Sequence, residues 1–254
     1  MIARCDDTRL VPKLTGRQPG CPVCPAFEHG LCEVAREGTW RSSDFLPNLV
    51  PQAEFTVRAR RLIVHQQDFR DSVPIICSGW AATVELLPDG RRQVLSFLLP
   101  GDIVSAGLLF APKPRRVVEA ITEVRYRKYK RDELKKLLCK RPELLERLLK
   151  DWLAETTRAD HLIVDLGRRS GEERIARLIL GLVERLSQRD MVEDNPIAFE
   201  FPLRQRQIAD AIGMTQVHVS KVFSDLRRNG LVRFRERILT ILDLVALRRL
   251  ASMG

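Results

Sequence analysis

Long apolar runs are missing from this sequence. Its 254 residues contain no stretch of about 18 consecutive apolar residues, so we expect no membrane-spanning helix and no membrane partner. The opening residues, MIARCDDTRL, lack an apolar core and carry two aspartates, which argues against a secretory signal peptide. We therefore expect a cytoplasmic protein. Structural disulfides are rare in that compartment, so the six cysteines are not expected to form them, and clustered cysteines are expected to bind metal or to sense redox state.

Histidine is scarce, and the common catalytic patterns are missing. The four histidines, His29, His65, His161 and His218, lie far apart in the sequence. Neither a Ser/His/Asp set nor an HExxH motif is present, so hydrolytic chemistry is not expected. An iron–sulfur enzyme is the alternative from this class, but it would need a substrate pocket that the sequence does not show. The sequence therefore favours a protein that is not an enzyme.

Basic residues are plentiful and concentrate near the C-terminus. The chain is 44% hydrophobic and 30% charged, which is typical of a globular protein, and its formal net charge is +10. Between Pro202 and Gly254 there are ten Lys and Arg against four Asp and Glu, so +6 of the +10 lies there. Such a segment has the electrostatic character of a surface that binds nucleic-acid phosphates.

Residues 202–231, PLRQRQIADAIGMTQVHVSKVFSDLRRNGL, predict two short helices joined by a tight turn. Gly213 is suited to end the first helix, Thr215 to cap the second, and Asn229-Gly230 to close it. This arrangement predicts a helix-turn-helix, whose second helix lies in the DNA major groove with its N-terminal residues facing base edges. The predicted inner faces consist of Ile208, Ala211, Ile212, Val219, Val222, Phe223 and Leu226.

The segment that follows favours DNA binding over the alternative of an ordinary helical hairpin in a core. Leu231–Leu242, LVRFRERILTIL, predicts two strands around a basic turn, as in the wing of a winged helix-turn-helix. The residues that we expect to contact DNA are Arg204, Gln205, Thr215, Gln216, Val217, His218, Ser220, Lys221, Arg235 and Arg237.

Three cysteines cluster near the N-terminus, within an arm that we place at residues 1–47. Gly20–Glu33, GCPVCPAFEHGLCE, has the pattern C-x2-C-x7-C, and a two-residue gap lets two thiolates reach the same metal. Such thiolates suit an iron–sulfur cluster or zinc, although three cysteines are one short of a four-ligand set. The alternatives are a reactive thiol pair or unligated cysteines. His29 is either a further ligand or an ordinary loop residue.

The middle of the chain predicts strands and then helices. Between Pro51 and Tyr129, short strands rich in β-formers alternate with turns such as Pro88-Asp89-Gly90, which predicts an all-β barrel or sandwich. The strands are expected at Pro74–Leu87, Arg92–Leu99 and, as two, within Val117–Tyr129. The helices are expected at Asp132–Cys139, from Pro142 to Gly167, and, after the capping box Ser170-x-x-Glu173, to about Ser187; the polar linker Gln188–Asn195 follows.

The long helix that begins at Pro142 carries apolar residues in alternating steps of four and three. That heptad spacing is typical of a two-stranded coiled coil, and we expect it to form a homodimer. The alternative is a helix that lies on its own barrel. We favour the dimer because helix-turn-helix proteins commonly bind two DNA half-sites as a dimer. The predicted dimerisation residues are Leu145, Leu149, Trp152, Thr156, Ala159, Ile163 and Leu166.

A β-barrel, a long helix and a winged helix-turn-helix, in that order, resemble the Crp/Fnr family of bacterial transcription regulators. The likeness runs from about Asn48 onward and is most specific at LPDGRRQVLSFLLPGD, GEERIARLI and IADAIGMTQVHVSKVFSDLRRNGLV. It implies an α+β fold: a cyclic-nucleotide-binding-like β-barrel (jelly roll) at 48–141, a dimerisation helix at 142–168 and a winged helix-turn-helix at 169–254. It also implies a homodimer that binds a two-fold-symmetric site on double-stranded DNA and contacts RNA polymerase.

The resemblance also bears on ligands. Cyclic-AMP-binding members place a glutamate for the ribose shortly after the Pro-Gly-Asp turn, and Ala106 stands there in this chain. Arg115 or Arg116 could supply the phosphate-binding arginine, but alanine cannot accept a hydrogen bond, so binding of cyclic AMP is not expected.

The oxygen-sensing Fnr branch holds a [4Fe–4S] cluster with N-terminal cysteines, and Cys21, Cys24 and Cys32 resemble three of its ligands. The fourth ligand of that branch lies on a late barrel strand, where this chain has Arg127, and arginine cannot ligate iron. A constitutive regulator without a cluster is therefore an alternative. The cysteines that could complete the set are Cys5 first, then Cys77 and Cys139.

Family members often read DNA with the pattern E-x-x-x-R on the second helix of the motif. The corresponding positions here are Val217 and Lys221. Lysine can donate to guanine O6 or N7, whereas valine can only touch a thymine methyl group. The half-site should therefore contain guanine, with a weaker demand at the base pair that a glutamate would read.

Overall fold

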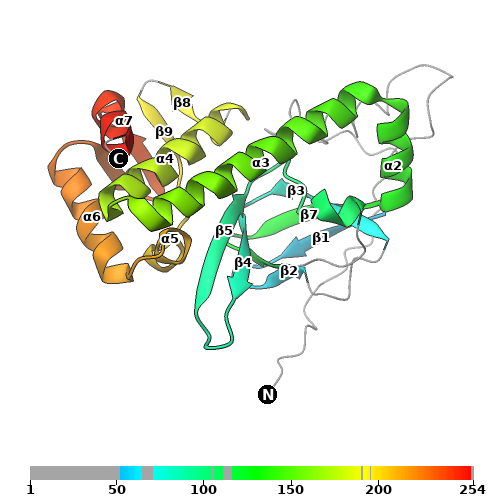
Figure 1. Ribbon diagram of the computed structural model, residues 1–254, viewed down its shortest axis with the longest axis horizontal. Helices are drawn as coiled ribbons and strands as arrows, with labels where there is room; N and C mark the ends of the chain where they lie inside the picture. The colour runs from blue at the N-terminus through cyan, green and yellow to red at the C-terminus, as the bar shows by residue number, and fades with distance from the viewer. Residues whose placement is uncertain are drawn as a thin grey trace. The chain divides into compact units, whose positions relative to one another are not determined.

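The computed structural model describes residues 52–64, 71–104, 106–110, 116–189, 191–194 and 196–252 (Figure 1). The chain forms two compact units, which are described in turn. Of the described residues, the first unit combines those up to residue 84 with those in 97–152, and the second combines 85–96 with those in 153–252. Cys5, Cys21, Cys24 and Cys32 lie outside the described residues, and so do His29, His65 and Arg115.

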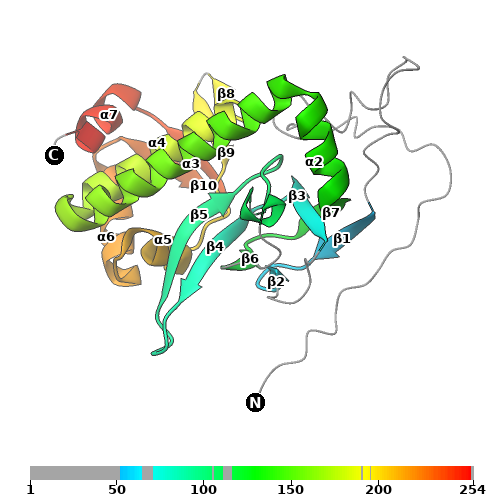
Figure 2. The same cartoon turned by 45° about the vertical axis from the view of Figure 1, so that its right-hand side comes forward.

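Antiparallel strands form the β-barrel that the sequence predicted, in two sheets. One sheet has the strand order β1-β7-β3, and the other has the order β2-β6-β4-β5. Figure 2 shows β4 and β5 running side by side as a long hairpin. The strands are β1 (Ala53–Val57), β2 (Leu62–Val64), β3 (Ser72–Ser78), β4 (Ala81–Leu86), β5 (Arg92–Leu98), β6 (Val117–Ala120) and β7 (Val124–Lys130).

The apolar run Pro74–Leu87, predicted as one strand, forms parts of two. The break falls at Gly79, which has a φ of +83°. A Cβ at this position would lie 2.0 Å from the carbonyl oxygen of Glu123, so no other residue fits without movement of the backbone. Periodicity alone could not locate this break, because apart from Ser78 the side chains near it on both sides are apolar.

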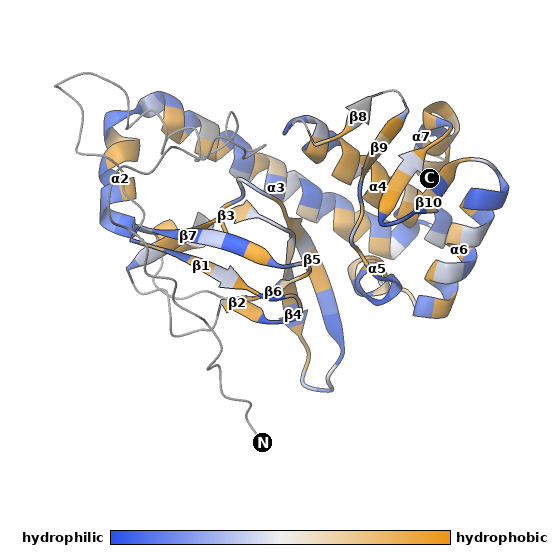
Figure 3. Cartoon of the chain, turned by 180° about the vertical axis from the view of Figure 1, so that it is seen from behind, coloured by the Kyte–Doolittle hydropathy of each residue, from blue (hydrophilic) through white to orange (hydrophobic). Residues whose placement is uncertain are grey.

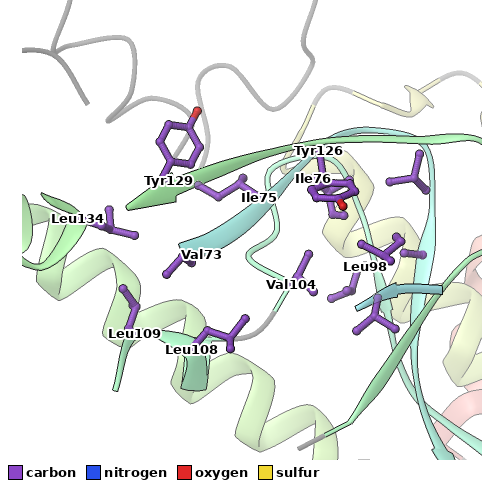
Figure 4. Close-up of a cluster of buried hydrophobic side chains, with 14 of the residues drawn as sticks. Val73, Ile75, Ile76, Leu98, Val104, Leu108, Leu109, Tyr126, Tyr129 and Leu134 are labelled. Carbon is purple, nitrogen blue, oxygen red and sulfur yellow. The ribbon is translucent and has the colours of Figure 1, made fainter. Parts of the chain in front are cut away.

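The two sheets enclose one apolar core (Figure 4). Val73, Ile75 and Ile76 of β3 and Tyr126 of β7 belong to this core, and all four side chains are almost fully buried. A short 3-10 helix, η1 (Ala106–Leu109), and the helix α2 (Arg131–Lys140) complete the core. Leu108, Leu109 and Leu134, which these two elements contribute, are completely buried.

The helix α3 (Pro142–Arg168) is the longest of the described elements. Leu144 and Leu148, near its start, are buried against the core of the first unit. Gly167 was predicted to end this helix, but the helix continues through it to Arg168. A glycine ends a helix effectively when it adopts a left-handed conformation, and Gly167 is not among the residues with positive φ.

In the second unit, helices surround a small antiparallel sheet with the strand order β10-β11-β9-β8. The residues after Ser187 were predicted as a polar linker, but Glu193–Asp194 pairs with the next strand, so the sheet has two strands more than the predicted wing. The elements are α4 (Gly171–Ser187), β8 (Glu193–Asp194), β9 (Ile197–Glu200), α5 (Gln205–Ile212), α6 (Gln216–Arg228), β10 (Val232–Arg235), β11 (Ile238–Ile241) and α7 (Leu244–Ser252).

The core of the second unit lies between these helices and the sheet. The predicted capping box opens α4: the hydroxyl of Ser170 accepts a hydrogen bond from the amide of Glu173, and the Glu173 carboxylate accepts one from the amide of Ser170. Phe201, at 2% exposure, lies against three other rings, those of Phe199, Phe223 and Phe234.

Residues 85–96 also belong to this unit. Their predicted turn is closed by Arg91, whose amide and guanidinium both donate to Asp89 and hold the pKa of that carboxyl below its usual value. Arg92 Nε lies 3.0 Å from Asp210 Oδ2, and Gln93 donates to the carbonyl of Ala211 over 3.0 Å. Over the described part of the chain, no helix combines the length and the apolar character needed to cross a membrane.

Candidate DNA-binding interface

The helix-turn-helix forms where the sequence predicted it, from α5 and α6 (Figure 1). Gly213 ends α5 in a left-handed conformation with a φ of +65°, and the amide of Met214 donates back to the carbonyl of Ala209. Thr215 caps α6, since its hydroxyl accepts a hydrogen bond from the amide of His218 over 3.3 Å. Local sequence signals therefore fix both ends of the turn.

The two faces of α6 differ sharply in exposure. Val219, Val222 and Leu226 are buried against the rest of the unit, as their spacing predicted. The opposite face is solvent-exposed, and it includes Val217, whose exposure of 81% is unusual for an apolar side chain. The first turn of α6 carries no acidic residue, so the partial positive charge of the helix start is left unopposed. The exposed residues of this face that the sequence singled out are Gln216, Val217, His218 and Lys221, while Ser220 is half-buried.

The wing is the hairpin of β10 and β11. Arg233 and Arg235 point to one face of β10 because side chains alternate along a strand, and Phe234 points to the other, toward Phe201. The tip of the hairpin is formed by Glu236 and Arg237, with φ values of +52° and +66°. Two successive left-handed residues are the mark of a type I′ turn, which normally contains Asn or Gly. Arg235 makes only a solvent-exposed ion pair with Glu236.

The start of α5 adds further exposed polar groups. Arg204 occupies the N-cap position, where its backbone amide donates to the side chain of Gln207 over 2.8 Å. The side chains of Arg204, Gln205 and Arg206 are exposed. Sequence reasoning missed Arg206 and Arg233 as candidate contacts. The signal that would have found Arg206 is its place in the basic segment next to Gln205, and for Arg233 it is the shared strand face with Arg235.

The predicted dimerisation face of α3 is exposed over most of its length. Trp152 and Ile163 are 57% and 70% exposed, and orange and blue segments alternate along the helix in Figure 3. Two further exposed apolar residues, Leu153 and Val164, were not predicted. Leu166 differs from the rest of the predicted set: it is half-buried, and its Cδ2 lies beside Gly213 of the same chain. The other exposed members of the predicted set are Leu145, Leu149, Thr156 and Ala159.

The described cysteines are not brought together. Cys77 lies on β3 and is half-buried, and Cys139 is exposed on α2. Arg127 has its Nε 2.8 Å from Glu54 Oε2. No group of three or more metal-ligating side chains occurs among the described residues.

Comparison with known proteins identifies both units. A family model for the cyclic nucleotide-binding domain matches residues 54–141, and one for the Crp-like helix-turn-helix domain matches residues 173–250. The nitrogen fixation regulation protein FixK of Bradyrhizobium diazoefficiens is 30% identical over 191 residues, which are 75% of this chain and 78% of that protein. The transcriptional activator protein FnrL of Cereibacter sphaeroides is 29% identical over 87% of this chain and 86% of its own length.

The structural comparison agrees. The structure of FixK2 from Bradyrhizobium japonicum matches with a TM-score of 0.70 at 28% identity, and the match covers 81% of this chain and all of that one. The predicted fold and the expectation of a regulator rather than an enzyme are therefore confirmed. With an N-terminal barrel, a long connecting helix and a C-terminal helix-turn-helix all in their expected order, the chain belongs to the Crp/Fnr family of transcription regulators.

Proposed function

We propose that this protein acts as a homodimer that binds a two-fold-symmetric DNA site and reads it with the exposed face of α6. The observation that carries the proposal is the set of exposed side chains behind the Thr215 cap, above all Val217 and Lys221. In a helix-turn-helix these N-terminal positions of the second helix face base edges. The exposed arginines of the wing and of the start of α5 are suited to bind phosphates on either side.

The homodimer is supported by α3. Exposed Leu, Trp, Ile and Val side chains on a single helix form an apolar surface that a lone chain has no reason to expose. A second copy of the same helix would bury this surface in a two-stranded coiled coil. Two helix-turn-helix motifs then face the same side of the DNA about one helical turn apart.

The bases read by each protomer follow from side-chain chemistry. The ammonium of Lys221 can donate to guanine O6 or N7, and Val217 can only touch a thymine methyl group. Each half-site should therefore contain a guanine at one position and show little preference at the position beside Val217. The bound dimer would recruit RNA polymerase and so change transcription of nearby genes in the cytoplasm.

The regulator either senses its signal through the N-terminal cysteines or acts without a cofactor. The C-x2-C-x7-C spacing of Cys21, Cys24 and Cys32 favours a [4Fe–4S] cluster, with Cys5 as the fourth ligand and Cys77 as the alternative. At the position that the resemblance assigns to the fourth thiolate of the oxygen sensors, this chain has Arg127, which is paired with Glu54. We therefore propose DNA binding that does not depend on a cluster. Ala106 likewise leaves the ribose of a cyclic nucleotide without its acceptor, so cyclic AMP is not proposed as the ligand.

Selection of binding sites from random duplex DNA tests the proposed function. Wild-type protein should return a two-fold-symmetric consensus with one conserved guanine in each half. Lys221→Ala should lower specific affinity by roughly 1–3 kcal/mol and relax the preference at that guanine. Arg228→Ala is the matched control, because Arg228 is an exposed basic residue at the far end of α6, where it pairs with Asp225. Its loss should leave the consensus unchanged. An identical consensus for wild type and Lys221→Ala would restrict Lys221 to phosphate contact.

A further inference from the structure

The guanidinium of Arg174 donates hydrogen bonds to three segments in and next to the helix-turn-helix. Arg174 of α4 donates from Nη2 to the carbonyl of Leu166 over 2.8 Å and from Nε to the carbonyl of Arg169 over 2.9 Å. From Nη1 it donates to the carbonyl of Ile212 over 3.0 Å. Leu166 lies in the last turn of α3, Arg169 in the link between α3 and α4, and Ile212 is the last residue of α5. We call these four residues the Arg174 joint.

The three acceptors share a physical property. The last carbonyl groups of a helix have no partner within the helix and carry the negative end of its dipole. A charged donor satisfies such groups strongly, and arginine offers five N–H bonds in one rigid plane. A lysine ammonium is a single point on a flexible stem, so it cannot hold three acceptors in these fixed directions. The joint therefore needs the shape of arginine as well as its charge.

Close packing at the same place leaves little freedom between the elements. A Cβ at Gly213 would lie 2.9 Å from Leu166 Cδ2, and a Cβ at Gly171 would lie 2.4 Å from Met214 Cε. The turn of the helix-turn-helix thus touches both the end of α3 and the start of α4. Beside it, the carboxylate of Asp165 lies 3.0 Å from Arg169 Nε and 2.8 Å from Arg177 Nε, which fixes α4 on the last turn of α3 by a separate contact.

We propose that Arg174 is a positioning residue that sets the orientation of the helix-turn-helix on the end of α3 and thereby the half-site spacing that the dimer accepts. The proposal rests on the proposed function, because it assumes that two copies pair through α3 on DNA. In such a dimer, the place of each α6 follows from how α5 and α6 are held at the end of its own α3. The hydrogen bonds from Arg174 to both α3 and α5 restrict the angle between these two helices directly.

A positioning role and a merely structural role predict different results. If Arg174 only stabilises the fold, its loss lowers the affinity for every operator by the same factor. If it positions the helix-turn-helix, its loss changes the relative affinities for operators of different spacing. The spacing profile, rather than the affinity itself, is therefore the readout.

The experiment compares wild type, Arg174→Gln and Arg174→Lys on a series of operators. All carry the same half-sites, and the central spacer is shortened or lengthened by one or two base pairs. Arg168→Gln is the matched control, because Arg168 is exposed at the end of α3 and its loss removes the same charge. Wild type and control should favour one spacing, whereas both Arg174 variants should reduce that preference by roughly tenfold or more, as expected for lost hydrogen bonds to a charged group.

The outcomes separate the two proposals. A wild-type spacing profile for Arg174→Gln, with all affinities lowered equally, would overturn the positioning role. Thermal unfolding shows whether each variant is folded, and where Arg174→Gln does not fold, Arg174→Lys keeps the charge and decides the question. A wild type that binds none of the operators would contradict the proposed function, whereas a wild type with a clear preference that both variants keep would contradict only the role of Arg174.

Discussion

Arg127 is the single residue that most separates this chain from a cluster-dependent oxygen sensor. It lies on β7 with its guanidinium against Glu54, and the resemblance to the oxygen sensors implies that their cysteine ligand would stand at this position. Arginine carries a permanent positive charge and has no lone pair to offer iron. The predicted seam of α3 also contains no acidic residue, so we expect no charge repulsion at dimerisation, unless the seam shifts by one residue and Asp160 takes the place of Ala159. Both features support the proposed dimer, which would form without a cluster.

This leads to a prediction about the cysteines. Replacement of Cys21, Cys24 and Cys32 by Ser should weaken operator binding by less than about 1.4 kcal/mol, which is a factor of ten. Affinity for one operator, measured with and without oxygen for both proteins, checks the prediction, and the iron and sulfide content of anoxically purified protein shows whether a cluster was present. A wild type that binds DNA only when anoxic and iron-loaded would make the cysteines an oxygen switch instead.

At the scale of elements, the turn of the wing contains residues that disfavour the conformation they adopt. Glu236 and Arg237 both adopt a left-handed conformation, which is costly for residues other than Gly, Asn and Asp. A wing that contacts phosphates gains from a basic residue at its tip, and Arg237 supplies one. Under the proposed function, contact between Arg237 and a phosphate would offset this conformational cost.

Replacing Glu236 by Asn should relieve part of this cost, because Asn tolerates the left-handed region. We expect the free energy of unfolding to rise by roughly 0.5–1 kcal/mol. Denaturant unfolding measures the change, with Glu236→Ala as the control that removes the same charge but keeps the strain. Equal unfolding midpoints for the Asn and Ala variants would show that the turn is not strained.

Elements with strong local signals could be predicted, and elements that depend on distant partners could not. Gly213, Thr215 and the Ser170 capping box act within one helical turn, so the sequence alone located those helix ends. The strand β8 has two residues and exists only through its pairing with β9. The exposure of Val217 followed from the helical period, whereas the three bonds of Arg174 join residues far apart in sequence and left no local pattern.

At the scale of the whole molecule, the proposed function requires two chains. Ile163 is 70% exposed in one chain and lies at the predicted seam of α3. A glutamate there would place two carboxylates opposite each other in a dry interface, where unpaired charges are costly. The fold of each chain should survive this change, because the side chain is exposed when the chain is alone. Ala154→Glu, at an exposed position on the outer side of the same helix, is the matched control.

The most direct test of a homodimer on two-fold DNA is sedimentation of wild type, Ile163→Glu and Ala154→Glu, alone and with the selected operator. Wild type and control should sediment as dimers and bind with two protomers per duplex. Ile163→Glu should sediment as a monomer, with a loss of about 3 kcal/mol or more in dimerisation free energy, and should lose operator binding with it. An Ile163→Glu protein that stays dimeric, or a single protomer that binds the full operator with wild-type affinity, would contradict the account.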